Sequence, residues 1–112
     1  MIKNYKIVVT PFAKQKLTEI RDYICLALSA PDTADHILQK LQKSINSLTT
    51  LPCRYRTINT KITALQEVRK IRCKNYYIYY WVNTEKCYVF ILDIIYVKAN
   101  QDEALHIVVK SI

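Results

Sequence analysis

The sequence predicts an α+β domain in which an antiparallel helix hairpin packs on one face of an antiparallel sheet. Three short runs rich in β-branched and aromatic residues lie between Leu65 and Lys98, and polar turn residues bound each run. Earlier in the chain, two longer stretches repeat apolar residues at every third or fourth position, as amphipathic helices do. With 112 residues, 51% of them hydrophobic, residues 1–112 are expected to form a single domain with a modest core.

The first predicted elements are a strand and a helix. Weak alternation over Tyr5–Val9 indicates a short N-terminal strand. Thr10 is a favourable N-cap, and Pro11 suits the first helical position because its missing N–H would have no partner there. A single apolar stripe then predicts one helix of about five turns, and its members are Phe12, Ala13, Leu17, Ile20, Ile24 and Leu28.

A second predicted helix follows a short break in the pattern. Pro31 or Asp32 opens this helix, which should end near Thr49–Thr50. Because the break is short, the two helices are expected to form a hairpin whose stripes pack together and onto a sheet. The second stripe consists of Ala34, Ile37, Leu38, Leu41, Ile45 and Leu48.

The segment Cys53–Ala64 is expected to be a loop between the hairpin and the strands. Its basic residues include Arg54 and Arg56. They fit a solvated loop and an anion-contacting loop equally well.

The three β-rich runs are expected to form a three-stranded antiparallel meander over Leu65–Cys73, Tyr76–Val82 and Cys87–Tyr96. The turn at Lys74–Asn75 should be tight, because asparagine adopts positive φ more readily than most residues with a Cβ. Residues 83–86 make the second turn. After the meander, residues 100–109 form a short C-terminal element that fits a helix or a strand.

Alternation along the strands divides their side chains between two faces of the sheet. Lys70 and Arg72 share a face of the first strand, while Tyr77, Tyr79 and Trp81 share a face of the second. The helices can cover one face of the sheet. We expect the other face, which should be basic and aromatic, to stay open for a partner.

The charge balance favours a partner that is a polyanion. Lys and Arg total 17 against 9 Asp and Glu, which gives a formal net charge of +8 and a sequence pI near 9.4. Nucleic acid, an acidic protein and anionic lipid all satisfy this balance. No apolar run approaches the ~20 residues of a membrane span, and the start lacks the features of a signal peptide, so a cytoplasmic location is expected.

Composition also argues against several classes of site. The chain has no glycine, which excludes the Gly-rich phosphate loops of P-loop and Rossmann proteins. No metal site or cofactor is expected, because the cysteines are scattered without a CxxC pair or clustered histidines. Free thiols are the favoured state of Cys25, Cys53, Cys73 and Cys87.

Four segments together resemble the RelE/ParE superfamily, the small basic toxins of bacterial type II toxin–antitoxin modules. They are Val68–Tyr80, Thr10–Ala13, Pro52–Tyr55 and Asp93–Lys98, and the resemblance extends from about Tyr5 to Lys98. It implies a toxin held inactive by an acidic, partly disordered antitoxin that wraps the sheet and the helix hairpin. It also implies that the pair can form a hetero-oligomer that binds operator DNA.

The superfamily has two modes of action. RelE-type toxins cut mRNA on the ribosome without a metal, whereas ParE-type toxins block DNA gyrase. Lys70, Arg72 and Lys98 stand where RelE-type toxins carry basic residues, and they are the catalytic candidates of that mode. Tyr77 replaces an expected arginine, and tyrosine lacks the charged bidentate fork that clamps a phosphate. This replacement and the long hairpin favour the ParE type.

The hypotheses for function therefore remain three. A ParE-like toxin would bind its target through the predicted open face and the basic loop; a RelE-like ribonuclease would need a proton carrier such as Tyr77, Tyr79 or His106. A nucleic-acid-binding module or an inactive toxin copy is the third. If these residues serve the fold and not a function, the tyrosines pack across strands and Asp93 pairs with a strand cation. The predicted binding residues are Arg54, Arg56, Arg69, Tyr77, Tyr79 and Trp81.

Overall fold

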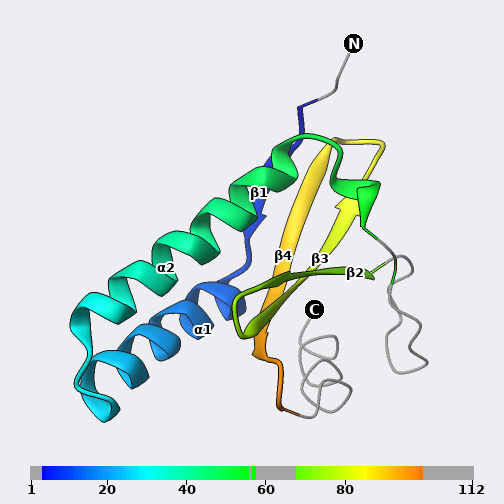
Figure 1. The fold of residues 1–112 in the computed structure, drawn as a ribbon. Helices are drawn as coiled ribbons and strands as arrows, with labels where there is room; N and C mark the ends of the chain where they lie inside the picture. The colour runs from blue at the N-terminus through cyan, green and yellow to red at the C-terminus, as the bar shows by residue number, and fades with distance from the viewer. Residues whose placement is uncertain (1–3, 56, 58–67, 100–112) are drawn as a thin grey trace.

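The computed structural model describes residues 4–55, 57 and 68–99 (Figure 1). Arg56, His106, most of the predicted loop and the predicted C-terminal element lie outside these residues. The elements follow in the order β1 (Lys6–Val9), α1 (Pro11–Asp22), η1 (Tyr23–Ala27), α2 (Pro31–Asn46), η2 (Ser47–Thr49), η3 (Pro52–Arg54), β2 (Val68–Cys73), β3 (Tyr76–Asn83) and β4 (Tyr88–Tyr96).

The strands form one four-stranded sheet in the order β1-β4-β3-β2. β2, β3 and β4 make the predicted antiparallel meander. β1 joins β4 in parallel, with Val9 opposite Ile91, so the sheet is mixed. Because parallel neighbours need a long crossover between them, β1 can pair with β4 only after the chain has passed through the helix hairpin. The α+β architecture predicted from the sequence is confirmed.

The helix hairpin covers one face of the sheet (Figure 1). Both predicted stripes contribute to the core on this face, through Ile20 and Ile24 from the first helical segment and Leu41 and Ile45 from α2. Each such side chain contributes about 1.5–3 kcal/mol by leaving water. From the sheet, the core receives Ile78, Tyr80, Val82, Val89, Ile91 and Ile94.

No helix among the described residues is long and apolar enough to cross a membrane.

Thr10 joins the first strand to the first helix as predicted. Its hydroxyl accepts a hydrogen bond from the backbone N–H of Ala13 at 3.3 Å, which caps α1, and donates one to the carbonyl of Ile91 at 2.7 Å. The cap satisfies one of the N–H groups that a helix start leaves without an internal partner. The second bond ties the start of α1 to β4.

The prediction of one continuous helix to Leu28 is wrong. α1 ends at Asp22 and gives way to a π-helical turn over Tyr23–Ala27, in which the N–H of Leu28 donates to the carbonyl of Tyr23, five residues earlier, at 3.2 Å. A π turn takes more residues than an α turn, so the side chains after Ile24 rotate out of the stripe. Leu28 is therefore 56% exposed instead of buried.

The absence of glycine places other residues in the left-handed region of φ. Ser29, Leu51, Lys74 and Cys87 all have positive φ, between 50° and 57°. In the β2–β3 turn Lys74 carries the positive φ, and not Asn75 as predicted. The first residue of a two-residue hairpin turn is the position that needs this conformation in one of the favoured turn types.

Candidate functional site

The face of the sheet opposite the hairpin brings together three of the predicted site residues. Arg72 lies opposite Tyr77 in the register of β2 and β3, and Lys70 is two residues away on the same face. The ammonium of Lys70 lies 4.2 Å from the centre of the Tyr77 ring, and the guanidinium carbon of Arg72 lies 6.0 Å from it. The two cations therefore flank one aromatic ring, an arrangement stabilised by cation–π attraction.

The prediction that this face is open is wrong for its centre. Tyr79 is only 2% exposed and belongs to a second apolar cluster with Val68, Leu92 and Ile95. Trp81 is half-buried and stacks on Phe90 with 5.6 Å between ring centres. Large aromatic side chains on both faces of a strand need apolar contact on both sides, and here the second face also receives it. Tyr79 and Trp81 are thus packing residues in this structure.

Arg69 and Arg54 hold the chain segment around Pro52 in place. The Arg69 guanidinium donates to the carbonyls of Cys53 and Tyr55, and Arg54 donates to the carbonyl of Thr50 at 2.8 Å. Arg69 is opposite Tyr80 in the strand register and so lies on the other face from Lys70 and Arg72. The expectation that Arg69 borders the same open face is therefore wrong.

Asp93 is the buried charged residue of the described part of the chain, and it lies at an irregularity of the sheet. The pairing of β3 with β4 jumps between Tyr79–Asp93 and Tyr80–Ile91, so Leu92 is an extra residue. Such a bulge redirects the neighbouring side chains. Asp93 Oδ1 accepts a hydrogen bond from the N–H of Ile94 at 2.8 Å, while its buried Oδ2 has no hydrogen-bond partner among residues 4–55, 57 and 68–99.

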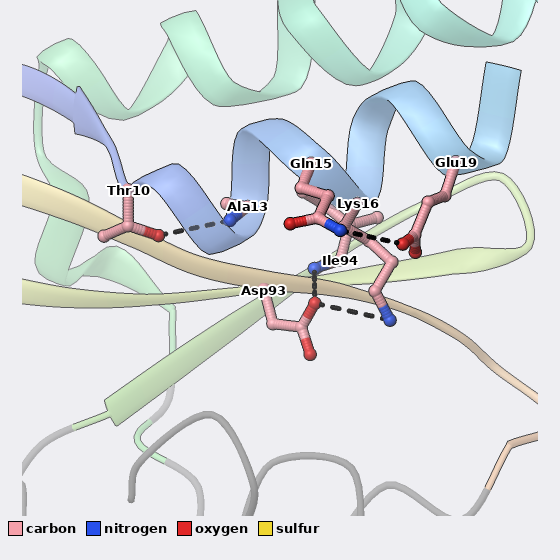
Figure 2. A network of polar contacts seen from close by, with 7 residues as sticks. All are labelled: Thr10, Ala13, Gln15, Lys16, Glu19, Asp93 and Ile94. Atoms are coloured by element: carbon pink, nitrogen blue, oxygen red, sulfur yellow. Dashed lines mark hydrogen bonds and ion pairs between the residues drawn. The ribbon is translucent and has the colours of Figure 1, made fainter. Parts of the chain in front are cut away.

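The prediction that Asp93 pairs with a cation of a strand is wrong, because its partner comes from a helix. Lys16 extends from α1 toward β4 and places its Nζ 3.7 Å from Asp93 Oδ1 (Figure 2). The reach is possible because β1 ends opposite Ile91 and leaves the following part of the β4 edge uncovered by β1. Burial raises the pKa of Asp93 to about 6, and the nearby Lys16 charge limits the rise.

Three titratable side chains of the described residues, those of Tyr76, Tyr80 and Asp93, are poorly placed for the proton transfer of a RelE-type ribonuclease. Burial raises the pKa of Tyr76 and of Tyr80, which makes both hydroxyls weaker acids and leaves less tyrosinate to act as a base at neutral pH. The Tyr80 hydroxyl is also engaged, since it donates to the carbonyl of Pro52 at 2.7 Å. Asp93, at 1% exposure, is closed off from a substrate. Lys98 is exposed beyond the end of β4.

An apolar groove that the sequence did not predict lies where the π-helical turn meets the start of β3 and the end of β4. It is a cavity of about 680 Å³, and its walls include Tyr23, Leu28, Ile37, Tyr76 and Tyr96. Three of these are unusually exposed for apolar side chains, with exposed fractions of 60% for Tyr23, 56% for Leu28 and 43% for Tyr96. We call this the apolar groove. Exposed apolar patches of this kind mark interaction sites.

One local signal in the sequence points to the apolar groove. Tyr23 and Leu26 are large apolar residues at the end of the first helix, yet both fall outside its stripe. Apolar residues off the stripe indicate either a change of helical register or a second contact surface. Both are present here, because the π turn begins at Tyr23 and the Tyr23 side chain lines the apolar groove.

Comparison with known proteins agrees with this geometry. The sequence profile of the family described as ParE toxin of type II toxin-antitoxin system, parDE, matches residues 7–100. No match was found among curated proteins. Two solved structures share the fold. The chromosomal ParDE toxin–antitoxin system from P. aeruginosa has a chain 18% identical in sequence, with a TM-score of 0.67, 84% of this chain covered and 97% of that one. The toxin–antitoxin complex RelBE2 from Mycobacterium tuberculosis has a chain 16% identical, with a TM-score of 0.59 and coverage of 84% and 92%.

Proposed function

The chain belongs to the ParE toxin family of type II toxin–antitoxin systems, and from this premise we propose that it arrests bacterial growth by blocking DNA gyrase. The observation that carries the proposal is the match to the ParE family over residues 7–100. The cytoplasm, where gyrase acts, is the proposed location. In this proposal the chain is toxic only when the cognate antitoxin is absent.

The arrangement of the outer sheet face supports the ParE type over the RelE type. Tyr77 stands where RelE-type toxins need an arginine, and its ring is flanked by Lys70 and Arg72. A tyrosine in this position cannot hold a phosphate in a bidentate charged clamp. Binding a large protein target needs no such clamp and no general base.

The apolar groove is the proposed docking site for an amphipathic segment of the antitoxin. Helix-in-groove recognition uses apolar anchors spaced along one helix face, and the exposed Tyr23, Leu28 and Tyr96 would receive them. The net charge of +8 favours an acidic partner, because opposite charge speeds association and excludes other partners. The toxin–antitoxin pair, as a hetero-oligomer, is then the species that would bind operator DNA.

The test is inducible expression of the chain in bacteria without antitoxin, with growth, transcript integrity and DNA breaks followed in one culture. Blocked gyrase predicts growth arrest with DNA breaks and intact transcripts, and co-expression of the antitoxin should restore growth. Arrest without DNA breaks would refute the gyrase target. Folded protein with no arrest at all would identify an inactive copy.

A ribosome-dependent ribonuclease is the second candidate, because Lys70 and Arg72 converge on one face of the sheet. This candidate predicts cleaved transcripts in the same culture and loss of cleavage in Lys70→Ala and Arg72→Ala variants. Lys14→Ala is the matched control, since Lys14 is an exposed cation on α1 away from this face. Cleavage that survives both substitutions would remove these residues from the reaction.

A further inference from the structure

A second groove of the molecule, between α2 and β2, is lined by cations. It is a cavity of about 590 Å³, and it is lined by Lys40 and Lys43 from α2, Arg54 from η3 and Arg72 from β2. Because β2 is the edge strand of the sheet, Arg72 borders this groove although its guanidinium lies beside Tyr77 on the face opposite the hairpin. Among the residues that the structure describes, none that lines this groove is acidic. We call this the basic groove. Only Arg54 and Arg72 of this set were candidates from the sequence, because Lys40 and Lys43 lie far from them along the chain.

The charges of the basic groove are not neutralised within the described residues. The ion pairs of this part of the chain join Lys16 to Asp93 and Arg21 to Asp22, and neither pair includes a groove residue. Like charges that share a groove raise one another's energy, and an anion between them lowers it. A bound anion would therefore lower the electrostatic energy of the groove.

The cations differ in what they have available for a ligand. Arg54 donates to the carbonyl of Thr50 and to Ser47, so its guanidinium is held as part of the wall. Arg72 donates from Nε to the carbonyl of Lys74 at 3.1 Å, and its two terminal nitrogens make no hydrogen bond within the described residues. Lys40 and Lys43 are exposed, three residues apart on one side of α2.

We propose that the basic groove binds phosphate groups of a polynucleotide backbone. Arginine guanidiniums and lysine ammoniums are the donors that protein surfaces use for phosphate oxygens, and both kinds line this groove. A peptide partner fits the groove less well, because apolar side chains contribute little to its rim: Ile71 and Cys73 are buried beneath it and Tyr55 is half-buried. The apolar groove has the opposite character and suits a peptide.

This binding site goes beyond the proposed block of gyrase and does not depend on it. A toxin that acts on a DNA-bound enzyme gains affinity for the assembly if it also holds the DNA backbone. The contact needs neither antitoxin nor gyrase, so the purified full-length chain is sufficient for a test.

The test measures anisotropy of a short fluorescein-labelled DNA duplex with the full-length chain from about 50 to about 200 mM KCl. The triple variant Lys40→Gln, Lys43→Gln, Arg72→Gln should weaken binding more than about tenfold and reduce the slope of log K against log salt by about 2 to 3. A charge-matched control triple replaces three exposed lysines outside the groove by glutamine, namely Lys6, Lys14 and Lys86. It should change affinity less than about threefold.

Three results separate the possible outcomes. Equal losses in the two triple variants would overturn the proposal, because net charge alone would then explain binding. A glutamate hexapeptide that displaces the duplex as well as an unlabelled duplex does would also overturn it and assign the groove to an acidic peptide. Displacement by inorganic phosphate beyond that by KCl at equal ionic strength would keep the phosphate chemistry but refute the polynucleotide as its source. Circular dichroism of both variants confirms that they are folded.

Discussion

The apolar groove and the basic groove share one helix but differ in chemistry. The first half of α2 contributes Thr33 and Ile37 to the apolar groove, and its second half contributes Lys40, Lys43 and Ser44 to the basic groove. Exposed aromatic and aliphatic side chains line one surface, and cations without an ion-pair partner in the described part of the chain line the other. A single amphipathic helix can thus present two binding surfaces when different neighbours cover its two halves.

The walls of the two grooves are also held by different interactions. Lys16 lies in the wall of the apolar groove and pairs with the buried Asp93. Arg54 and Tyr55 in the wall of the basic groove follow Pro52, whose carbonyl accepts the neutral hydrogen bond from Tyr80. One support titrates near pH 6 and the other does not titrate near neutral pH. This difference can be tested directly.

The largest expected effect concerns the apolar groove. The double variant Leu28→Glu, Tyr96→Glu should weaken binding of the cognate antitoxin about a thousandfold, because each change removes an anchor and introduces a charge that repels an acidic partner. Calorimetric titration measures the affinity, and loss of growth rescue in cells accompanies it. Leu51→Glu is the matched control, since Leu51 is 59% exposed and outside the groove. An equal loss in the control would assign antitoxin binding to another surface.

The second effect is a pH dependence of stability that comes from Asp93. Its pKa rises from 3.8 to about 6 on folding, so the folded state holds the proton more tightly. The resulting stability is fully present below about pH 4 and is lost as the pH rises through 6. The free energy of unfolding should therefore fall by about 3 kcal/mol over this window from this group.

Urea unfolding at several pH values measures this contribution, and Asp93→Asn should remove it. Asparagine keeps an oxygen for the N–H of Ile94 but does not ionise. Asp35→Asn is the control, because Asp35 is exposed on α2. If the Asp93→Asn profile kept the full slope between pH 4 and pH 6, another group would be responsible.

The smallest effect concerns the support of the basic groove. Tyr80→Phe should lower the free energy of unfolding by about 1–2 kcal/mol at any pH between 5 and 8, because the buried carbonyl of Pro52 loses its donor. Thermal or urea unfolding measures the change. Tyr88→Phe, at a half-buried tyrosine on β4, is the comparison. A loss that varied with pH in the Tyr80 variant would contradict a neutral hydrogen bond as the support.

The element pattern of the chain was predictable because its signals are local. The alternation of β3 and the helical spacing of α2 repeat within a few residues, and Thr10–Pro11 marks a helix start by its own chemistry. The candidate site was predicted less well. Lys70, Arg72 and Tyr77 do share a face, as strand periodicity requires. The burial of Tyr79 was missed, because periodicity does not say whether a face is covered.

The α+β fold class, the helix hairpin and the meander thus follow from patterns along the chain, since hydrophobic periodicity and turn chemistry act between near neighbours. Long-range packing alone produced the parallel pairing of β1 with β4, the ion pair of Lys16 with Asp93, and the two grooves. The physical reason is that each of these features joins residues from separate elements. Their approach depends on how the hairpin lies on the sheet, and no local pattern encodes that arrangement.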